Sequence, residues 1–172
     1  SKSEHDFRNS VKQRSFIRRK IMIAIIDYGV GNIFSLSASL KYIGEEACLT
    51  HDKDIIHRAD RVILPGVGAF ADARNKLLQS GMDKAVQSEA SDGKPILGIC
   101  LGMQLMFERS FEYGEYEGLG LIGGDVVPIR DVCKDKVKIP HMGWNKLSFP
   151  KKNELFSLCS EGEYVYFVHS YC

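Results

Sequence analysis

The residues best suited to chemistry surround Cys100, in the segment Gly98-Ile99-Cys100-Leu101-Gly102. This is a G-x-nucleophile-x-G pattern, with cysteine where hydrolases of another class carry serine. Flanking glycines leave room for a sharp strand-to-helix turn, which strains the backbone of the nucleophile. The following helix directs its N-terminal amides at the sulfur and favours the thiolate, while the Leu101 N–H is placed to stabilise an oxyanion. We therefore expect Cys100 to be a nucleophile, although a lone cysteine at a strand end is often just a small buried apolar residue.

A second glycine-rich segment, Pro65-Gly66-Val67-Gly68-Ala69-Phe70, also follows a predicted strand. Glycines let the backbone approach a bound group and point its amides inward. The third glycine of a dinucleotide-binding G-x-G-x-x-G fingerprint is missing here, and it is also missing after Gly29-Val30-Gly31. We expect Gly66, Val67 and Gly68 to supply a second oxyanion donor beside Cys100. The alternative is a tight turn that merely requires glycine.

Alternating strands and helices are predicted to position these two segments. The apolar run 21–27 is typical of a parallel strand buried on both faces, and further strands are expected at 47–49, 61–64 and 95–99. Helices are expected at 33–43, with Gly44 placed for a C-terminal cap, and at 69–79 and 82–90. A further helix is expected directly after Cys100, with an amphipathic face over Met103–Phe107. From Leu119 onward, short β-type runs separated by Gly and Pro indicate added, partly antiparallel strands. The pattern predicts an α/β fold, a three-layer sandwich around a mostly parallel central sheet.

The composition excludes several classes of function. The chain has 172 residues, 44% of them hydrophobic and 26% charged, as in a globular domain. Its net charge of +1 gives no argument for a nucleic-acid partner, and no apolar stretch is long enough for a membrane span. The five cysteines are scattered without a CxxC pair, which fits neither a disulfide framework nor a zinc site. We expect reduced thiols in a cytoplasmic protein, with no metal and no cofactor.

The domain is expected to span residues 21–172. Residues 1–20 are polar and become basic toward their end, so we interpret them as an extension or a cloning remnant outside the domain.

Four segments together resemble one family, the class I (triad-type) glutamine amidotransferases, and within it the glutaminase subunits of imidazole glycerol phosphate synthases. They are Ile25–Asn32, Pro65–Phe70, Gly98–Gln104 and Pro140-His141-Met142-Gly143-Trp144-Asn145. The cysteine segment alone indicates only the broad class, whereas P-H-M-G-W-N is the more specific marker. The resemblance runs from about Met22 to Cys172 and implies a flavodoxin-like sandwich.

The resemblance implies a mechanism. Cys100 would attack the side-chain amide of glutamine, form a thioester and release ammonia. Amides from Gly66–Gly68 and from Leu101 would hold the oxyanion. Gln104 is similar to a family residue that helps to bind glutamine, and its spacing places it on the Cys100 side of the helix. Glu112 would meet the α-amino group of the substrate.

The resemblance also implies a partner, a (β/α)₈-barrel cyclase that uses the ammonia in histidine biosynthesis and forms a heterodimer with this subunit. Five residues would face this partner: Asn32, His141, Met142, Trp144 and Asn145. An exposed Trp–Met–His group is typical of an interface, although a single tryptophan more often lies in a core.

A catalytic base is missing from the pattern. In this family a histidine and a glutamate in an H-P-E sequence near the C-terminus activate the cysteine, and no H-P-E occurs here. His169 corresponds to a strand upstream of that sequence, so we do not assign it as the base. The remaining histidines, His5, His51, His57 and His141, lie in the tail, in a polar surface segment or in the interface motif. We expect that about the last quarter of the domain is absent from this sequence. The chain alone should then hydrolyse glutamine very slowly or not at all.

Three alternatives stay open at this point. The same module could feed ammonia to another synthase, such as a sugar-modifying enzyme. It could be a non-catalytic, partner-binding relic that lacks the triad His and Glu. A cysteine hydrolase of the same architecture is the third, although it has no use for P-H-M-G-W-N.

Overall fold

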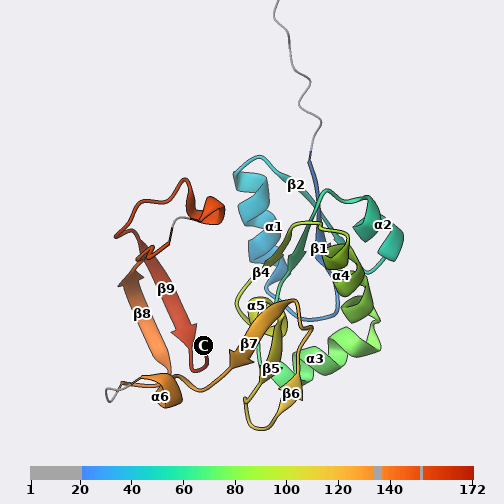
Figure 1. Cartoon of the computed structure of the whole chain (residues 1–172). Coiled ribbons are helices and arrows are strands. Elements are labelled where there is room, and N and C mark those ends of the chain that lie inside the picture. The colour runs from blue at the N-terminus through green and yellow to red at the C-terminus, as the bar shows by residue number, and fades with distance from the viewer. Residues whose placement is uncertain (1–20, 134–136, 152) are drawn as a thin grey trace, which may run out of the picture.

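The computed structural model describes residues 21–133, 137–151 and 153–172, and Figure 1 traces their path. In chain order the elements are β1 (Met22–Ile26), α1 (Ile33–Tyr42), β2 (Glu46–Thr50), α2 (Lys53–Arg58), β3 (Arg61–Leu64), α3 (Phe70–Gln79), α4 (Met82–Ser91), β4 (Ile96–Gly98), α5 (Leu101–Leu105), β5 (Phe107–Ser110), β6 (Tyr116–Glu117), β7 (Ile122–Val126), α6 (Ile129–Val132), β8 (His141–Lys146), the short 3₁₀ helix η1 (Glu154–Phe156) and β9 (Tyr164–His169). No helix among these residues is long and apolar enough to cross a membrane.

Four strands form one parallel sheet in the order β2-β1-β3-β4. Strand β1 is apolar throughout, and its residues Ala24, Ile25 and Ile26 are fully buried. Such a strand needs neighbours on both edges and helices above and below it. It has both, because β1 pairs along its length with β2 and from Ile23 to Ile25 with β3. The apolar run therefore forms the central strand that its composition predicts.

Helices cover both faces of this sheet (Figure 1). On one face, side chains of β1 and β3 such as Ile26 and Leu64 pack with residues of α2, α3, α4 and α5 in the larger core cluster. On the other face, the buried isoleucines Ile23, Ile25 and Ile63 pack against the apolar side of α1. The predicted α/β three-layer sandwich is confirmed.

Two smaller sheets follow in the second half of the chain. Strand β5 pairs antiparallel with β6 and parallel with β7, and β8 pairs antiparallel with β9. Figure 1 shows the β8–β9 pair standing apart from the parallel sheet. The residues after β9 return to the segment after β7, where Val127 and Cys172 exchange two backbone hydrogen bonds of 2.9 Å. The antiparallel strands expected toward the C-terminus are thus present, and the end of β9 is tied to the body of the domain.

The sequence pattern was wrong about the length of the helix after Cys100. The expected helical face ran from Met103 to Phe107, but α5 ends at Leu105 and Phe107 begins β5. The cause is competition for carbonyl groups. The Leu105 carbonyl accepts from the Leu119 N–H at 2.8 Å, and the Met106 carbonyl accepts from Leu121 and Ile122, so neighbouring chain takes the acceptors that further helical turns would use.

Candidate active site

Cys100 has the strained backbone predicted for a nucleophile at a sharp turn. Its φ of 54° and ψ of −118° lie in a region that residues with a Cβ rarely adopt, and it sits between the end of β4 and the start of α5. Such a conformation costs about 1–3 kcal/mol and persists only where the surroundings enforce it. The residue is exposed, so it is not the small buried residue of the alternative interpretation.

The two flanking glycines are required for this turn, because a side chain at either position would clash with neighbouring backbone. A Cβ on Gly102 would lie 1.9 Å from the Leu64 carbonyl oxygen, and a Cβ on Gly98 would lie 2.4 Å from the Met103 Cα. In both cases the obstacle is backbone, which cannot rotate away as a side chain can. The pattern G-x-C-x-G is therefore a packing requirement, because strand β3 and the start of α5 touch directly.

The Pro65–Phe70 segment lies directly against the Cys100 turn. A Cβ on Gly66 would lie 2.4 Å from the Gly102 nitrogen and 2.9 Å from the Leu101 carbonyl carbon, so only glycine allows this approach. Gly66 is buried, whereas Val67 and Gly68 are exposed. Within the described part of the chain, the N–H groups of Leu101, Val67 and Gly68 have no hydrogen-bond acceptor. These donors are available to an oxyanion at the sulfur.

A cavity of about 330 Å³ opens beside Cys100. Its walls come from the cysteine turn and from the end of β9, and they include Met103, Gln104, Tyr166, Phe167, Val168, His169, Tyr171 and Cys172. Gln104 lies on the Cys100 side of α5, as its spacing predicts. The volume falls in the range of small-molecule sites.

His169 lines this cavity, but both of its ring nitrogens are engaged elsewhere. Its Nδ1 lies 2.9 Å from the Tyr171 carbonyl oxygen, and its Nε2 lies 2.9 Å from His141 Nδ1. A carbonyl only accepts, so His169 Nδ1 carries a proton, and a neutral His169 then accepts from His141 at Nε2. His141 in turn contacts the Asn145 side-chain nitrogen through Nε2. No ring nitrogen in this chain of contacts is left to take a proton from Cys100, which agrees with leaving His169 unassigned as the base.

Comparison with known proteins identifies the family of this chain. The family described as "Glutamine amidotransferase class-I" matches residues 24–172. The imidazole glycerol phosphate synthase subunit HisH of Oceanobacillus iheyensis is 51% identical over 150 residues, which cover 87% of this chain and 73% of that protein. The same subunit of Bacillus licheniformis is 48% identical over 152 residues, covering 87% of this chain and 71% of the relative. The chain belongs to the class I glutamine amidotransferases.

A solved structure described as "Crystal structure of glutamine amidotransferase" has the same fold. It matches with a TM-score of 0.64 over 87% of this chain and 71% of the other, at 17% sequence identity. At that identity the match concerns the fold alone, and it agrees with the flavodoxin-like sandwich that the family resemblance implied.

The residues expected to face a partner of this amidotransferase are arranged in three ways. Met142 and Trp144 are 59% and 66% exposed on one face of β8, so the tryptophan is not part of the core. His141 and Asn145 lie on the opposite face of the strand and contact each other. Asn32 is exposed and caps α1 by accepting the Ser35 N–H at 3.2 Å. Their role at an interface stays a prediction.

Glu112, expected to meet the substrate's α-amino group, is not part of the cavity wall. Its Oε2 accepts the Phe70 N–H at 2.6 Å. Tyr28, which the sequence analysis did not single out, is buried and donates its hydroxyl to the Pro65 carbonyl at 2.6 Å. Burial raises the pKa of Tyr28 well above its usual range, so it stays protonated as a donor. These two side chains hold the two ends of the glycine-rich segment.

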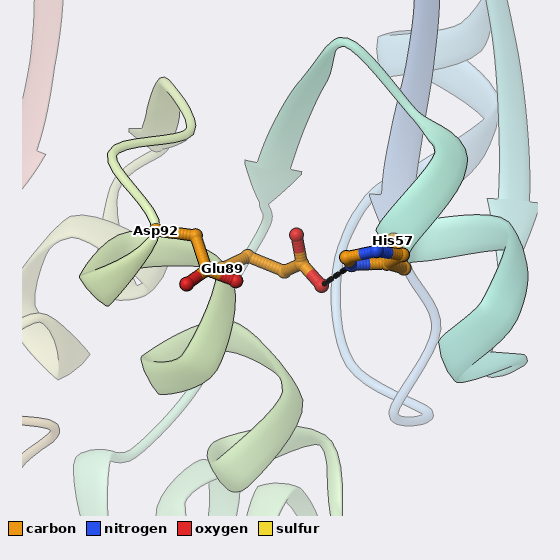
Figure 2. A group of neighbouring side chains, drawn as sticks. All are labelled: His57, Glu89 and Asp92. Carbon is orange, nitrogen blue, oxygen red and sulfur yellow. Dashed lines mark hydrogen bonds and ion pairs between the residues drawn. The ribbon is translucent and has the colours of Figure 1, made fainter.

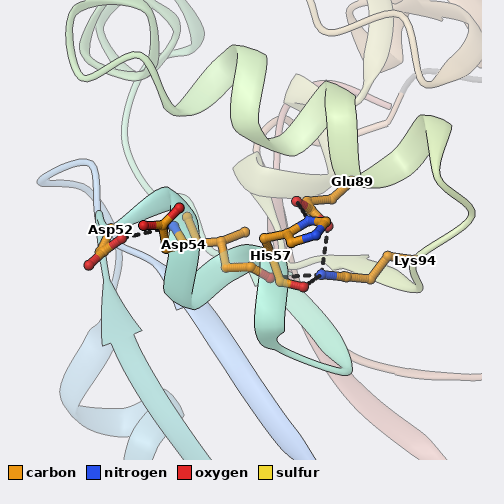
Figure 3. Close-up of polar contacts among 6 residues, drawn as sticks. Asp52, Asp54, His57, Glu89 and Lys94 are labelled. Carbon is orange, nitrogen blue, oxygen red and sulfur yellow. Dashed lines mark hydrogen bonds and ion pairs between the residues drawn. The ribbon is translucent and has the colours of Figure 1, made fainter.

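A further group of potential metal ligands lies on α2 and at the end of α4. Ligand atoms of His57, Glu89 and Asp92 lie within 4.8 Å of one another (Figure 2). The Lys94 ammonium, however, lies 2.6 Å from Glu89 Oε2 and donates to the carbonyls of Ile56 and His57 at 2.8 and 2.7 Å (Figure 3). It supplies the positive charge that a bound cation would bring. The group is therefore an ion-pair cluster that joins α2 to α4.

The Lys94 contact also decides the charge on the buried carboxylate. Burial alone would raise the pKa of Glu89, but the hydrogen bonds and charges of Lys94 and His57 outweigh it and lower the pKa below its ordinary value. Sequence reasoning missed this cluster because its members come from separate elements, one of which, α2, was interpreted as a polar surface segment. The only local signal was Asp52, whose side chain caps α2 by accepting the Asp54 N–H at 2.8 Å.

Proposed function

We propose that this chain is a glutaminase subunit that hydrolyses glutamine to glutamate and ammonia through a thioester on Cys100. The observation that carries the proposal is the exposed, strained Cys100 turn packed against the Pro65–Phe70 segment, whose Val67 and Gly68 N–H groups have no acceptor among the described residues. The sulfur attacks the side-chain carbonyl carbon of glutamine, and the carbonyl oxygen becomes an oxyanion. The N–H groups of Leu101, Val67 and Gly68 stabilise that charge. Gln104 and Glu112 bind the substrate.

Collapse of the tetrahedral intermediate breaks the C–N bond and releases ammonia, which requires a proton donor. Water then hydrolyses the thioester to glutamate, which requires a proton acceptor. Within residues 21–133, 137–151 and 153–172, no histidine nitrogen is hydrogen-bonded to the Cys100 sulfur. We therefore expect the 172-residue polypeptide alone to turn over very slowly.

The acceptor of the ammonia is, on this proposal, a (β/α)₈-barrel cyclase that makes imidazole glycerol phosphate in histidine biosynthesis. Support comes from the two relatives named above, both of them subunits of imidazole glycerol phosphate synthase, at 51% and 48% identity. Neither points to a sugar-modifying synthase. Met142, Trp144 and Tyr166 are exposed on β8 and β9, and residues of these types are enriched at protein–protein interfaces.

Ammonia release from L-glutamine tests the proposal, measured with and without the cyclase and compared with Cys100→Ser. We expect turnover close to the Cys100→Ser background for the polypeptide alone. We also expect one equivalent of an electrophilic glutamine analogue to bind to it covalently. Fast hydrolysis by the polypeptide alone would contradict the expectation that the described residues supply no base for Cys100, because some group would then have to act as one. Failure to react with the analogue would contradict the nucleophilic role of Cys100.

A further inference from the structure

The start of α3 is capped by a side chain from a distant part of the chain. The N-cap residue, Ala69, makes no side-chain cap hydrogen bond, and the first helical N–H, that of Phe70, donates instead to Glu112 Oε2 at 2.6 Å. Glu112 follows β5 and is 42 residues away in sequence. Its own N–H donates to the fully buried Ser110 hydroxyl at 3.3 Å, which fixes its backbone. A distant carboxylate thus holds the point where the glycine-rich segment becomes a helix.

The other end of the segment is held as well, which leaves its centre between two anchors. Tyr28 donates to the Pro65 carbonyl at 2.6 Å, and Gly66 is pressed against the backbone of Leu101 and Gly102. Val67 and Gly68 are exposed, and a Cβ on Gly68 would meet nothing within 4 Å. The position of their N–H groups therefore depends on the anchors at either end.

Glu112 also lies close to the Cys100 cavity. The pKa of Tyr171, a residue of the cavity wall, is raised by burial first and then by the nearby Tyr113 and Glu112. The rings of Tyr113 and Tyr171 are 6.3 Å apart, so the Glu112–Tyr113 pair borders the cavity wall. Glu112 Oε1 has no hydrogen-bond partner within the described residues. One carboxylate oxygen is bound to the glycine-rich segment, and the other is available to a ligand.

We propose that Glu112, the substrate contact of the proposed function, is also a positioning residue for the oxyanion donors. Its Oε2 holds the Phe70 N–H and so sets the position of the Val67 and Gly68 amides, while its Oε1 faces the α-ammonium of glutamine. The inference rests on the proposed function. The two roles need different chemistry, because the ammonium requires a negative charge whereas the Phe70 N–H requires only an acceptor oxygen.

This difference gives a test with a matched pair of variants, Glu112→Gln and Glu112→Ala. The glutamine keeps an acceptor oxygen without charge, and the alanine keeps neither. The probe is a chloroketone analogue of L-glutamine. The Cys100 thiolate first adds to the ketone carbon, and the carbonyl oxygen becomes an alkoxide in the oxyanion site. The sulfur then displaces chloride from the adjacent methylene carbon, the bond from sulfur to the former ketone carbon breaks, and the carbonyl re-forms, which leaves a thioether at Cys100. The concentration dependence of labelling at Cys100 separates binding of the probe from the maximal rate of labelling.

Both variants are expected to weaken probe binding by about tenfold or more, since each loses the charge. Only Glu112→Ala is expected to lower the maximal rate, by about ten- to a hundredfold, because displaced amides stabilise the oxyanion poorly. Iodoacetamide, which develops no carbonyl oxyanion, should label Cys100 at the same rate in all three proteins. Equal maximal rates for the two variants would overturn the inference.

A second measurement keeps the inference testable if Glu112→Ala labels poorly for other reasons. Hydrogen exchange of the Phe70 amide should be protected in the wild type and in Glu112→Gln, and at least about tenfold faster in Glu112→Ala. Unchanged exchange in Glu112→Ala would refute the capping role. If the proposed glutaminase function is wrong, the wild-type protein should instead be labelled equally fast by the L- and D-forms of the chloroketone. This result is distinguishable from a failure of the capping role alone.

Discussion

The substitution Gly102→Ala tests whether direct backbone contact builds the cysteine turn. A Cβ at this position would lie 1.9 Å from the Leu64 carbonyl oxygen, whereas real contacts of this kind are essentially never below 3.0 Å. The start of α5 and the end of β3 must therefore separate by about 1.1 Å. The oxygen belongs to the central sheet, where the Ile99 N–H binds it at 3.0 Å, so the separation also stretches that hydrogen bond.

Overpacking of this kind typically costs about 1–3 kcal/mol, and the loss of the Ile99 hydrogen bond adds about 1 kcal/mol. For a domain of this length we expect a fall in Tm of about 5–12 °C. Gly123→Ala is the matched control, because a Cβ there meets nothing within 4 Å and its φ lies outside the positive range. Both substitutions reduce the entropy of the unfolded chain equally, so their difference reports the folded state.

Thermal and urea unfolding of the two variants, followed by circular dichroism, gives this difference directly. A Gly102→Ala protein within about 1 kcal/mol of Gly123→Ala would refute the argument that β3 and α5 touch at this point. Labelling of Cys100 by the glutamine chloroketone should slow only in Gly102→Ala, since the same shift moves the Leu101 amide.

Four further predictions concern single side chains. Lys94→Met leaves the buried Glu89 carboxylate with His57 as its remaining partner and should lower the free energy of unfolding by about 3 kcal/mol, measured by urea unfolding. The pKa of Glu89 is lowered in the folded state, so its ion pair should stabilise the fold above the ordinary carboxyl pKa. This stabilisation should be lost as the pH falls through the lowered pKa. Unfolding measured over an acid pH series should show the loss, and Glu89→Gln should abolish this pH dependence. Tyr28→Phe should cost about 1–2 kcal/mol by leaving the Pro65 carbonyl without its donor. Trp144→Ala should change stability by less than about 0.5 kcal/mol, because the ring is 66% exposed, yet weaken binding to the cyclase at least about tenfold in a titration.

Much of the fold follows from local sequence patterns. The apolar run before Asp27 predicts a central strand because only a doubly covered strand tolerates continuous burial. The glycines around Cys100 predict a strained turn, because their spacing leaves no other use for both of them, and the observed φ of 54° agrees. Gly44, with a φ of 83°, follows the last turn of α1 as its position predicts.

Other features depend on contacts between distant segments, which local patterns do not encode. The carbonyls of Leu105 and Met106 are taken by residues 119–122, so α5 stops one turn after the cysteine. Glu112 and Tyr28 reach the glycine-rich segment from 42 and 37 residues away, so their anchoring role has no sequence signature. The P-H-M-G-W-N motif is conspicuous as a pattern, but its folding as strand β8 depends on pairing with β9.

The most direct test of the central claim is the site of covalent reaction with the glutamine chloroketone. After one equivalent has reacted, peptide mapping by mass spectrometry should find the adduct on Cys100 alone, although Cys133, Cys159 and Cys172 are also exposed. L-glutamine should slow the reaction, and D-glutamine should not. An adduct distributed over several cysteines, or a rate that L-glutamine leaves unchanged, would contradict the assignment of Cys100 as the glutamine-directed nucleophile.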